Sequence, residues 1–136
     1  MKSIKIALTS MFLILSSYAS AVEISSNVGL SSDYIWRGMS QTNGDMAVNG
    51  GFDISADNGF YFGTWASNAN YTGTSMELDI YIGFSGEMAE NMTYNIGYIS
   101  VIYPGNDSLD FEEAYIGFNI YGLSILYSDG QNNGPS

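Results

Sequence analysis

The stretch that decides the fold is Met76-Glu77-Leu78-Asp79-Ile80-Tyr81-Ile82-Gly83-Phe84. Every even-numbered position in it holds a large apolar residue, and the odd-numbered positions hold acidic, aromatic or glycine residues. Side chains of a β-strand alternate between its two sides with a period of two, whereas a helix would spread both sets around its circumference. The stretch therefore predicts a strand with one apolar and one polar face.

Similar alternation recurs along the chain, interrupted by polar turns such as Asp57-Asn58-Gly59. Pro104 ends the fifth expected strand, because proline cannot donate a hydrogen bond to a neighbouring strand. Longer polar connections are expected after the first, third and fifth strands, and shorter ones after the second, fourth and sixth. The expected strands are residues 22–37, 46–56, 60–67, 76–85, 92–103, 110–120 and 123–128, and the longer connections are residues 38–45, 68–75 and 105–109.

This organisation predicts an all-β fold, an antiparallel up-and-down transmembrane β-barrel. Strands of roughly 9 to 12 residues fit a tilted crossing of a bilayer, and outer-membrane barrels combine short periplasmic turns with longer external loops. A soluble up-and-down barrel is the alternative. Bacterial barrels need an even number of strands and at least about eight. With about seven strands present, the barrel is expected to be incomplete, unless a short form closes by forming a homo-oligomer.

The amino terminus predicts export. Lys2 and Lys5 precede the apolar run Ile6 to Leu15, and Ala19-Ser20-Ala21 resembles a signal-peptidase site. We expect residues 1–21 to be a cleaved signal peptide and residues 22–136 to be a partial β-barrel domain. An uncleaved membrane anchor is the alternative, but the apolar run is shorter than the roughly 20 residues that a spanning helix needs.

Composition excludes several classes of function. From Val22 onward Arg37 is the only basic residue against 14 acidic ones, a formal charge of 1 − 14 = −13, which argues against nucleic acid as a partner. The chain has no histidine and no cysteine, so the usual catalytic triads and zinc sites are excluded. The acidic pairs Glu77/Asp79 and Glu112/Glu113 need no catalytic explanation on a wet strand face. The sequence therefore predicts no enzyme, no catalytic residue, no cofactor and no metal site.

Two sets of residues acquire expected positions from the strand pattern. The charged set is expected to face the lumen, where rings of carboxylates favour cations, and Arg37 is expected to pair with an acid near the external rim. Aromatic residues near the strand ends are expected to form interfacial girdles, with ordinary packing as the alternative. The lumen-facing candidates are Asp33, Arg37, Asp53, Glu77, Asp79 and Glu113; the girdle candidates are Tyr34, Trp36, 60–62, Trp65, Tyr98, Tyr103, Tyr121 and Tyr127.

The segment Ser32-Asp33-Tyr34-Ile35-Trp36-Arg37-Gly38-Met39-Ser40-Gln41-Thr42, followed by residues 47–53, 59–68, 77–83 and 103–105, resembles the Gcw_chp family. The resemblance implies a TorF-type porin, a barrel in the outer membrane of a Gram-negative bacterium. Family members are longer, and this chain has no final amphipathic strand ending in an aromatic residue. It is therefore expected to be truncated at its carboxyl end.

The function expected from these observations is an outer-membrane porin for passive diffusion of small solutes, with cation preference. Its expected partners are outer-membrane lipid, small solutes or cations, and the outer-membrane assembly machinery. Two alternatives stay open. One is a non-conducting structural or adhesive outer-membrane barrel that works through residues 38–45 and 68–75. The other is a secreted soluble β-barrel that binds a small ligand.

Overall fold

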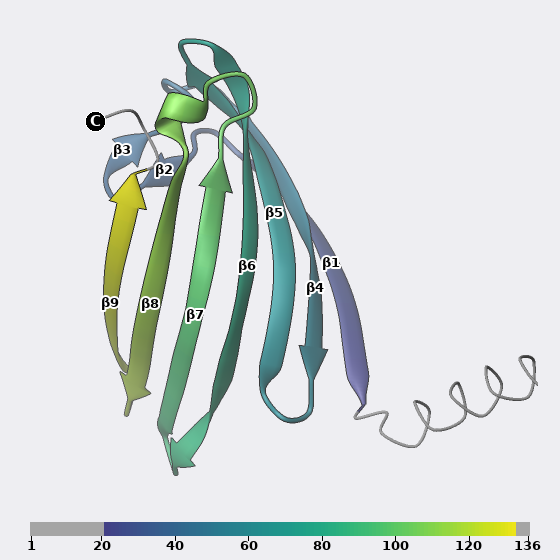
Figure 1. Ribbon diagram of the computed structural model, residues 1–136, viewed down its shortest axis with the longest axis vertical. Coiled ribbons are helices and arrows are strands. Elements are labelled where there is room, and N and C mark those ends of the chain that lie inside the picture. The colour runs from purple at the N-terminus through teal and green to yellow at the C-terminus, as the bar shows by residue number, and fades with distance from the viewer. Residues whose placement is uncertain (1–20, 133–136) are drawn as a thin grey trace, which may run out of the picture.

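The computed structural model describes residues 21–132 and confirms an all-β antiparallel fold (Figure 1). Seven strands form one sheet in the up-and-down order β1-β4-β5-β6-β7-β8-β9, and β2 with β3 forms a separate small hairpin. The sheet strands are β1 (Val22–Ser31), β4 (Ala47–Ala56), β5 (Phe60–Tyr71), β6 (Thr74–Ala89), β7 (Met92–Ile102), β8 (Phe111–Ile120) and β9 (Leu123–Asn132).

Within residues 21–132 the sheet is open, with β1 and β9 as its two edges. The same residues contain no helix long and apolar enough to cross a membrane. The expected signal peptide lies outside the described residues, except for Ala21.

The strand register keeps the two-residue alternation in phase across the sheet. Asp53 on β4 lies opposite Gly63 on β5, which lies opposite Tyr81 on β6. The same row continues through Ile99 on β7 to Glu113 on β8. We call the face that carries this row the inner face and the opposite face the outer face. A row of the outer face runs through Ile54, Phe62, Ile82, Tyr98 and Ala114.

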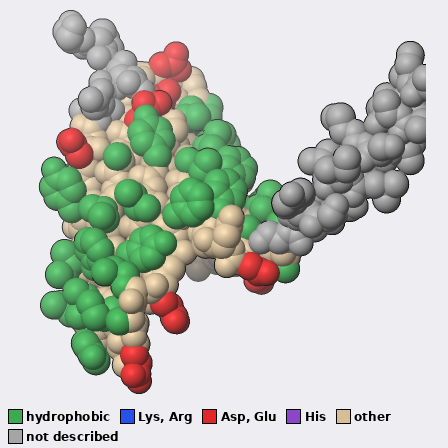
Figure 2. Space-filling model, turned by 60° about the horizontal axis from the view of Figure 1, so that its bottom comes forward, with side chains coloured by type: hydrophobic (Ala, Val, Ile, Leu, Met, Phe, Trp, Pro, Cys, Tyr) green, Lys and Arg blue, Asp and Glu red, His purple; other side chains and the backbone are tan. Residues whose placement is uncertain are grey.

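Large apolar side chains lie uncovered on the outer face. Val28 is 83% exposed and Phe52 is 66% exposed, and Ile82 and Phe84 near the middle of the sheet are also exposed. Figure 2 shows hydrophobic side chains spread over one face of the molecule, with acidic side chains toward its margins. The buried hydrophobic residues of the described part are few: Ala47, Ala69, Val101 and Tyr103. The sheet therefore does not bury its apolar face in a protein core.

Three inner-face tyrosines each lie directly opposite a glycine on the next strand. Tyr61 pairs with Gly83, Tyr81 with Gly63, and Tyr115 with Gly97. A Cβ on Gly97 would stand only 2.5 Å from Tyr115 Oη and 2.7 Å from Tyr61 Oη. Glycine in a strand interior commonly marks a place where another group approaches closely. These glycines thus give the aromatic rings room to lie flat against the sheet.

The connection after β1 differs most from the expectation. The first strand was expected to continue to Arg37, but β1 ends at Ser31, and residues Ser32–Met46 form a segment that we call the strap. Inside the strap, β2 (Ile35–Trp36) and β3 (Met39–Ser40) are joined by Arg37 and Gly38, which both have positive φ, +47° and +83°. Two such residues in succession are the signature of a type I′ hairpin turn.

Other element bounds also need correction. The expected long connection 68–75 is wrong, because β5 runs to Tyr71 and β6 begins at Thr74, with Gly73 at φ +88° in the tight turn between them. The last strand extends to Asn132 instead of ending at Ser128. The connection 103–110 includes a single 3₁₀ turn, η1 (Asp107–Leu109). The longer connections therefore follow β1 and β7 only.

The aromatic residues expected to form girdles are divided between the two faces of the sheet and the strap. Phe60, Phe62, Tyr98 and Tyr127 lie on outer-face positions. Tyr61, Trp65 and Tyr103 instead belong to the inner-face set of their strands, and Tyr34 and Trp36 are in the strap. For these five residues the girdle expectation is wrong, because their hydroxyl groups and rings find partners over the inner face.

Candidate functional site

A hollow of about 700 Å³ lies on the inner face, and the strap forms part of its wall. The sheet contributes acidic and tyrosine side chains to the lining, and the strap contributes Tyr34, Trp36 and Arg37. Four of the six charged residues expected to share one face are on the sheet side of this hollow. They are Asp53, Glu77, Asp79 and Glu113.

Glu77 is the buried anchor of the strap. Its side chain is 3% exposed. Tyr34 Oη of the strap donates a hydrogen bond to Glu77 Oε1 at 2.7 Å, and Tyr103 Oη donates one to Oε2 at 2.5 Å. Burial, followed by the hydrogen bond to Glu77, raises the pKa of both tyrosines above its ordinary value. Both oxygens of the carboxylate are thus occupied by protein hydroxyls.

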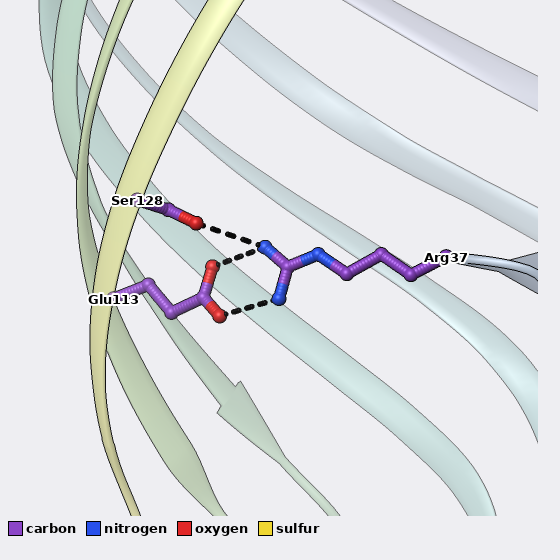
Figure 3. A network of polar contacts seen from close by, with 3 residues as sticks. All are labelled: Arg37, Glu113 and Ser128. Atoms are coloured by element: carbon purple, nitrogen blue, oxygen red, sulfur yellow. Dashed lines mark hydrogen bonds and ion pairs between the residues drawn. The ribbon is translucent and has the colours of Figure 1, made fainter.

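Arg37 meets Glu113 in a two-armed ion pair at the tip of the strap (Figure 3). Its Nη1 donates to Oε1 at 2.8 Å, and its Nη2 donates to Oε2 at 2.7 Å and to Ser128 Oγ at 3.1 Å. The guanidinium carbon also lies 4.1 Å from the centre of the Trp36 ring, which packs against Phe111 at 5.7 Å between ring centres. The hydrogen bonds with Glu113 raise the pKa of Arg37 above its ordinary value.

The acid that was expected to pair with Arg37 is therefore Glu113, which is 76 positions further along the chain. Planar guanidinium and carboxylate groups match in this two-armed geometry, which makes such a pair stronger than a single contact. The strap begins at the end of β1, and through this contact its tip reaches β8 and β9 near the other edge of the sheet.

Asp33 does not reach the inner face. Its Oδ1 accepts hydrogen bonds from Ser40 Oγ at 2.6 Å and Thr42 Oγ1 at 2.8 Å, so it holds the two ends of the strap's hairpin together. These hydrogen bonds hold the pKa of Asp33 below its ordinary value of 3.8. Ser40 Oγ in turn accepts the Gly44 N–H at 2.9 Å. Of the six predicted residues, Asp33 has a role within the strap that differs from the expected one.

Gln41 attaches the strap to the hairpin of β5 and β6. Its backbone oxygen accepts the Asn70 N–H at 2.8 Å, its own N–H donates to the Tyr34 carbonyl oxygen at 2.7 Å, and its side-chain oxygen accepts a hydrogen bond from Tyr71 Oη. Gln41 is 3% exposed and its neighbour Thr42 is 1% exposed. The base of the strap is therefore packed as tightly as any part of the described chain.

Three tyrosines of the sheet, Tyr61, Tyr81 and Tyr115, also line the hollow, and the sequence pattern did not identify them as site residues. Tyr81 Oη donates to Asp53 Oδ1 at 2.5 Å. Tyr61 Oη donates to Asn95 Oδ1 at 2.5 Å and lies 2.7 Å from Tyr115 Oη. A signal was present, because Tyr81 has the same parity as Glu77 and Asp79 in the stretch that predicted the fold.

Asp79 differs from the other carboxylates of the hollow because its Oδ1 is buried and has no hydrogen-bond partner among residues 21–132. With Asp53, Glu77, Asp79 and Glu113 against Arg37, the formal charge of the lining is 1 − 4 = −3. No three metal-binding side chains converge on one point among residues 21–132. An acidic lining of this kind attracts positive charge into the hollow.

Comparison with known proteins gives one family match. The model of the family described as "Bacterial protein of unknown function (Gcw_chp)" matches residues 16–126. No curated protein and no solved structure matches the chain.

Proposed function

Given that the chain belongs to the Gcw_chp family, we propose that it forms part of an outer-membrane β-barrel that lets small solutes, preferentially cations, diffuse through its interior. The observation that carries the proposal is the inverted arrangement of the sheet. Large apolar side chains are exposed on the outer face, while carboxylates and tyrosines line the inner face. Soluble monomers rarely expose a contiguous apolar surface of this kind, and lipid would cover it.

The cation preference rests on the charge of the hollow. Four carboxylates and one guanidinium line it, and an acidic lining raises the local concentration of cations and lowers that of anions. Asp53 is the best single probe, because it is half-buried and asparagine would keep an oxygen to accept the hydrogen bond from Tyr81, whereas both oxygens of Glu77 and of Glu113 accept hydrogen bonds.

A matched pair of lysine substitutions on β6 tests the membrane location. Ile82→Lys would place a charge on the outer face, and Ser85→Lys would place one on the inner face beside the hollow. If lipid covers the outer face, Ile82→Lys should cost about 2–4 kcal/mol and reduce the amount of folded protein. Heat-modifiable electrophoresis of the full-length protein in the outer-membrane fraction measures this. Equal effects of the two lysines, or recovery of the protein from the periplasm, would contradict the proposal.

Conductance across a planar bilayer tests the channel and its preference. In a salt gradient the full-length protein should give a reversal potential of cation-selective sign, and Asp53→Asn should move that potential toward zero. Glu112→Gln is the control, because Glu112 lies on the outer face, where it accepts a hydrogen bond from Tyr98. An anion-selective reversal potential would refute the cation preference.

A non-conducting barrel is the second candidate, and the tyrosine contacts favour it. On the inner face Tyr61 bonds to Tyr115 and Asn95, and Tyr81 bonds to Asp53, as side chains that fill a closed interior would do. Small barrels can have interiors filled by side chains. Absence of conductance from a protein that is correctly folded in the outer membrane would favour this candidate over the channel.

A further inference from the structure

The strap is much longer than the connection that its ends require. Ser31 at the end of β1 and Ala47 at the start of β4 are directly paired, and two residues suffice to join paired antiparallel strands. The strap instead crosses to the far side of the sheet, where Arg37 meets β8 and β9 (Figure 1). The extra length of the strap therefore does not serve to connect β1 with β4. It places side chains of the strap over the inner face.

The strap is fastened strongly at its base and lightly at its tip. At the base, the half-buried Tyr34 and the buried Gln41 and Thr42 bond to β5, β6 and the strap itself. At the tip, the Arg37 side chain is 47% exposed and is held by its ion pair with Glu113 and one hydrogen bond to Ser128. The Trp36 ring on which it stacks makes one further contact with the sheet, at Phe111. A change at Arg37 should therefore free the tip while the base stays in place.

We propose that the strap sets the size limit for solutes that pass through the interior, and that the Arg37–Glu113 ion pair holds its tip in the limiting position. Trp36 and Arg37 already form part of the wall of the hollow, so releasing the tip removes two large side chains from the route. This inference rests on the proposed function. It assigns Arg37 the role of a positioning residue, which acts through the location of the strap.

Arg37 also neutralises one carboxylate, so a charge effect must be separated from a size effect. Uncharged solutes make this separation, because their passage does not respond directly to the charge of the wall. The readout is therefore the entry of uncharged sugars of graded size into liposomes that contain the full-length protein. Measurement in about 1 M salt, where the screening length is about 3 Å, gives the corresponding check for conductance.

Four variants test the inference. Arg37→Gln removes the charge and the two-armed contact, and should raise the size limit, with several-fold faster entry of sugars that the wild type admits slowly. Glu113→Arg should act in the same direction, and the double exchange Arg37→Glu with Glu113→Arg should restore the wild-type limit by remaking the pair. Glu112→Gln, next in sequence but on the opposite face, should change nothing. An unchanged size limit in Arg37→Gln would overturn the inference.

The position of the strap can be read without any channel activity. The chain has no cysteine, so Trp36→Cys with Phe111→Cys supplies the only thiols, at two side chains whose rings are in contact. A short bifunctional thiol reagent should cross-link this pair, several-fold more slowly when Arg37→Gln is added. Cross-linking without passage of any solute would refute the channel and this inference, but it would still show that the strap lies against β8. Passage without cross-linking would refute the inference alone.

Discussion

Replacing Glu77 with glutamine should lower the free energy of unfolding of the full-length protein by about 2 kcal/mol. The carboxylate accepts hydrogen bonds from Tyr34 and Tyr103, and a hydrogen bond to a charged group contributes about 1.5–3 kcal/mol. Glutamine keeps one acceptor oxygen, and a neutral hydrogen bond retains about 0.5–1.5 kcal/mol. Its amide group faces the second hydroxyl as a donor, so the charged contact there is lost. Relief of the repulsion between Glu77 and Asp79 reduces the total cost to about 2 kcal/mol.

The assay is urea unfolding of the refolded protein in detergent, followed by tryptophan fluorescence. The ring of Trp65 lies 5.2 Å from that of Tyr34, so the signal reports the anchor directly. Glu87→Gln is the matched control, because Glu87 is an exposed residue of the same strand and the same face. If the two variants differ by less than about 0.5 kcal/mol, which is the usual range for a surface substitution, the buried anchor does not stabilise the fold as argued.

Three further predictions concern packing and protonation. Gly83→Ala should destabilise the protein by about 1–3 kcal/mol, because a Cβ at this position would overlap the Tyr61 hydroxyl group and a backbone oxygen. Gly117→Ala is the control in the same urea assay and should be tolerated, because no atom lies nearer than 3.4 Å to a Cβ placed there. The pKa of Asp33 is held below its ordinary 3.8, so its contribution to strap stability is complete above that pH and is lost as the pH falls through the lower folded-state pKa. Near-ultraviolet circular dichroism should show this acid transition. If the transition persists in Asp33→Asn, the assignment to Asp33 is contradicted. The pKa of Tyr103 is raised above 10.0, so its contribution to stability is complete below pH 10 and is lost as the pH rises further. An absorbance titration should show the Tyr103 phenolate forming at a higher pH in the wild type than in Glu77→Gln. No difference between the two proteins would refute the hydrogen-bonded anchor.

The seven strands of the sheet were predictable because the information that forms them is local. In residues 76–84 each side chain is assigned to a face by its own position, and the register then carries the same parity to both neighbouring strands. Asp53, Glu77, Asp79 and Glu113 could therefore be placed together on one face before any contact was known. The turn between β4 and β5 was also readable, because Asp57, Asn58 and Gly59 tolerate turn conformations.

The connections were less predictable because polar residues suit a turn and a strand end alike. Asn70 and Thr74 have the composition of a loop, but pairing between β5 and β6 continues through the Tyr71–Thr74 pair. Tyr34 and Trp36 continue the parity of β1, and this pattern says nothing about Asp33 accepting hydrogen bonds from Ser40 and Thr42. Those hydrogen bonds draw the chain out of the sheet after Ser31.

The sequence by itself determined an antiparallel sheet with an apolar outer face and an acidic inner face, because a strand's side chains alternate in a way that depends only on position along the chain. Only the tertiary structure decided what lies over the acidic face. The contact of Arg37 with Glu113 joins positions 76 residues apart, and the two hydroxyl donors on Glu77 come from two different connections. Such contacts depend on how the curved sheet places strands that are far apart in the sequence beneath the same strap. A pattern of neighbouring residues contains no information about that arrangement.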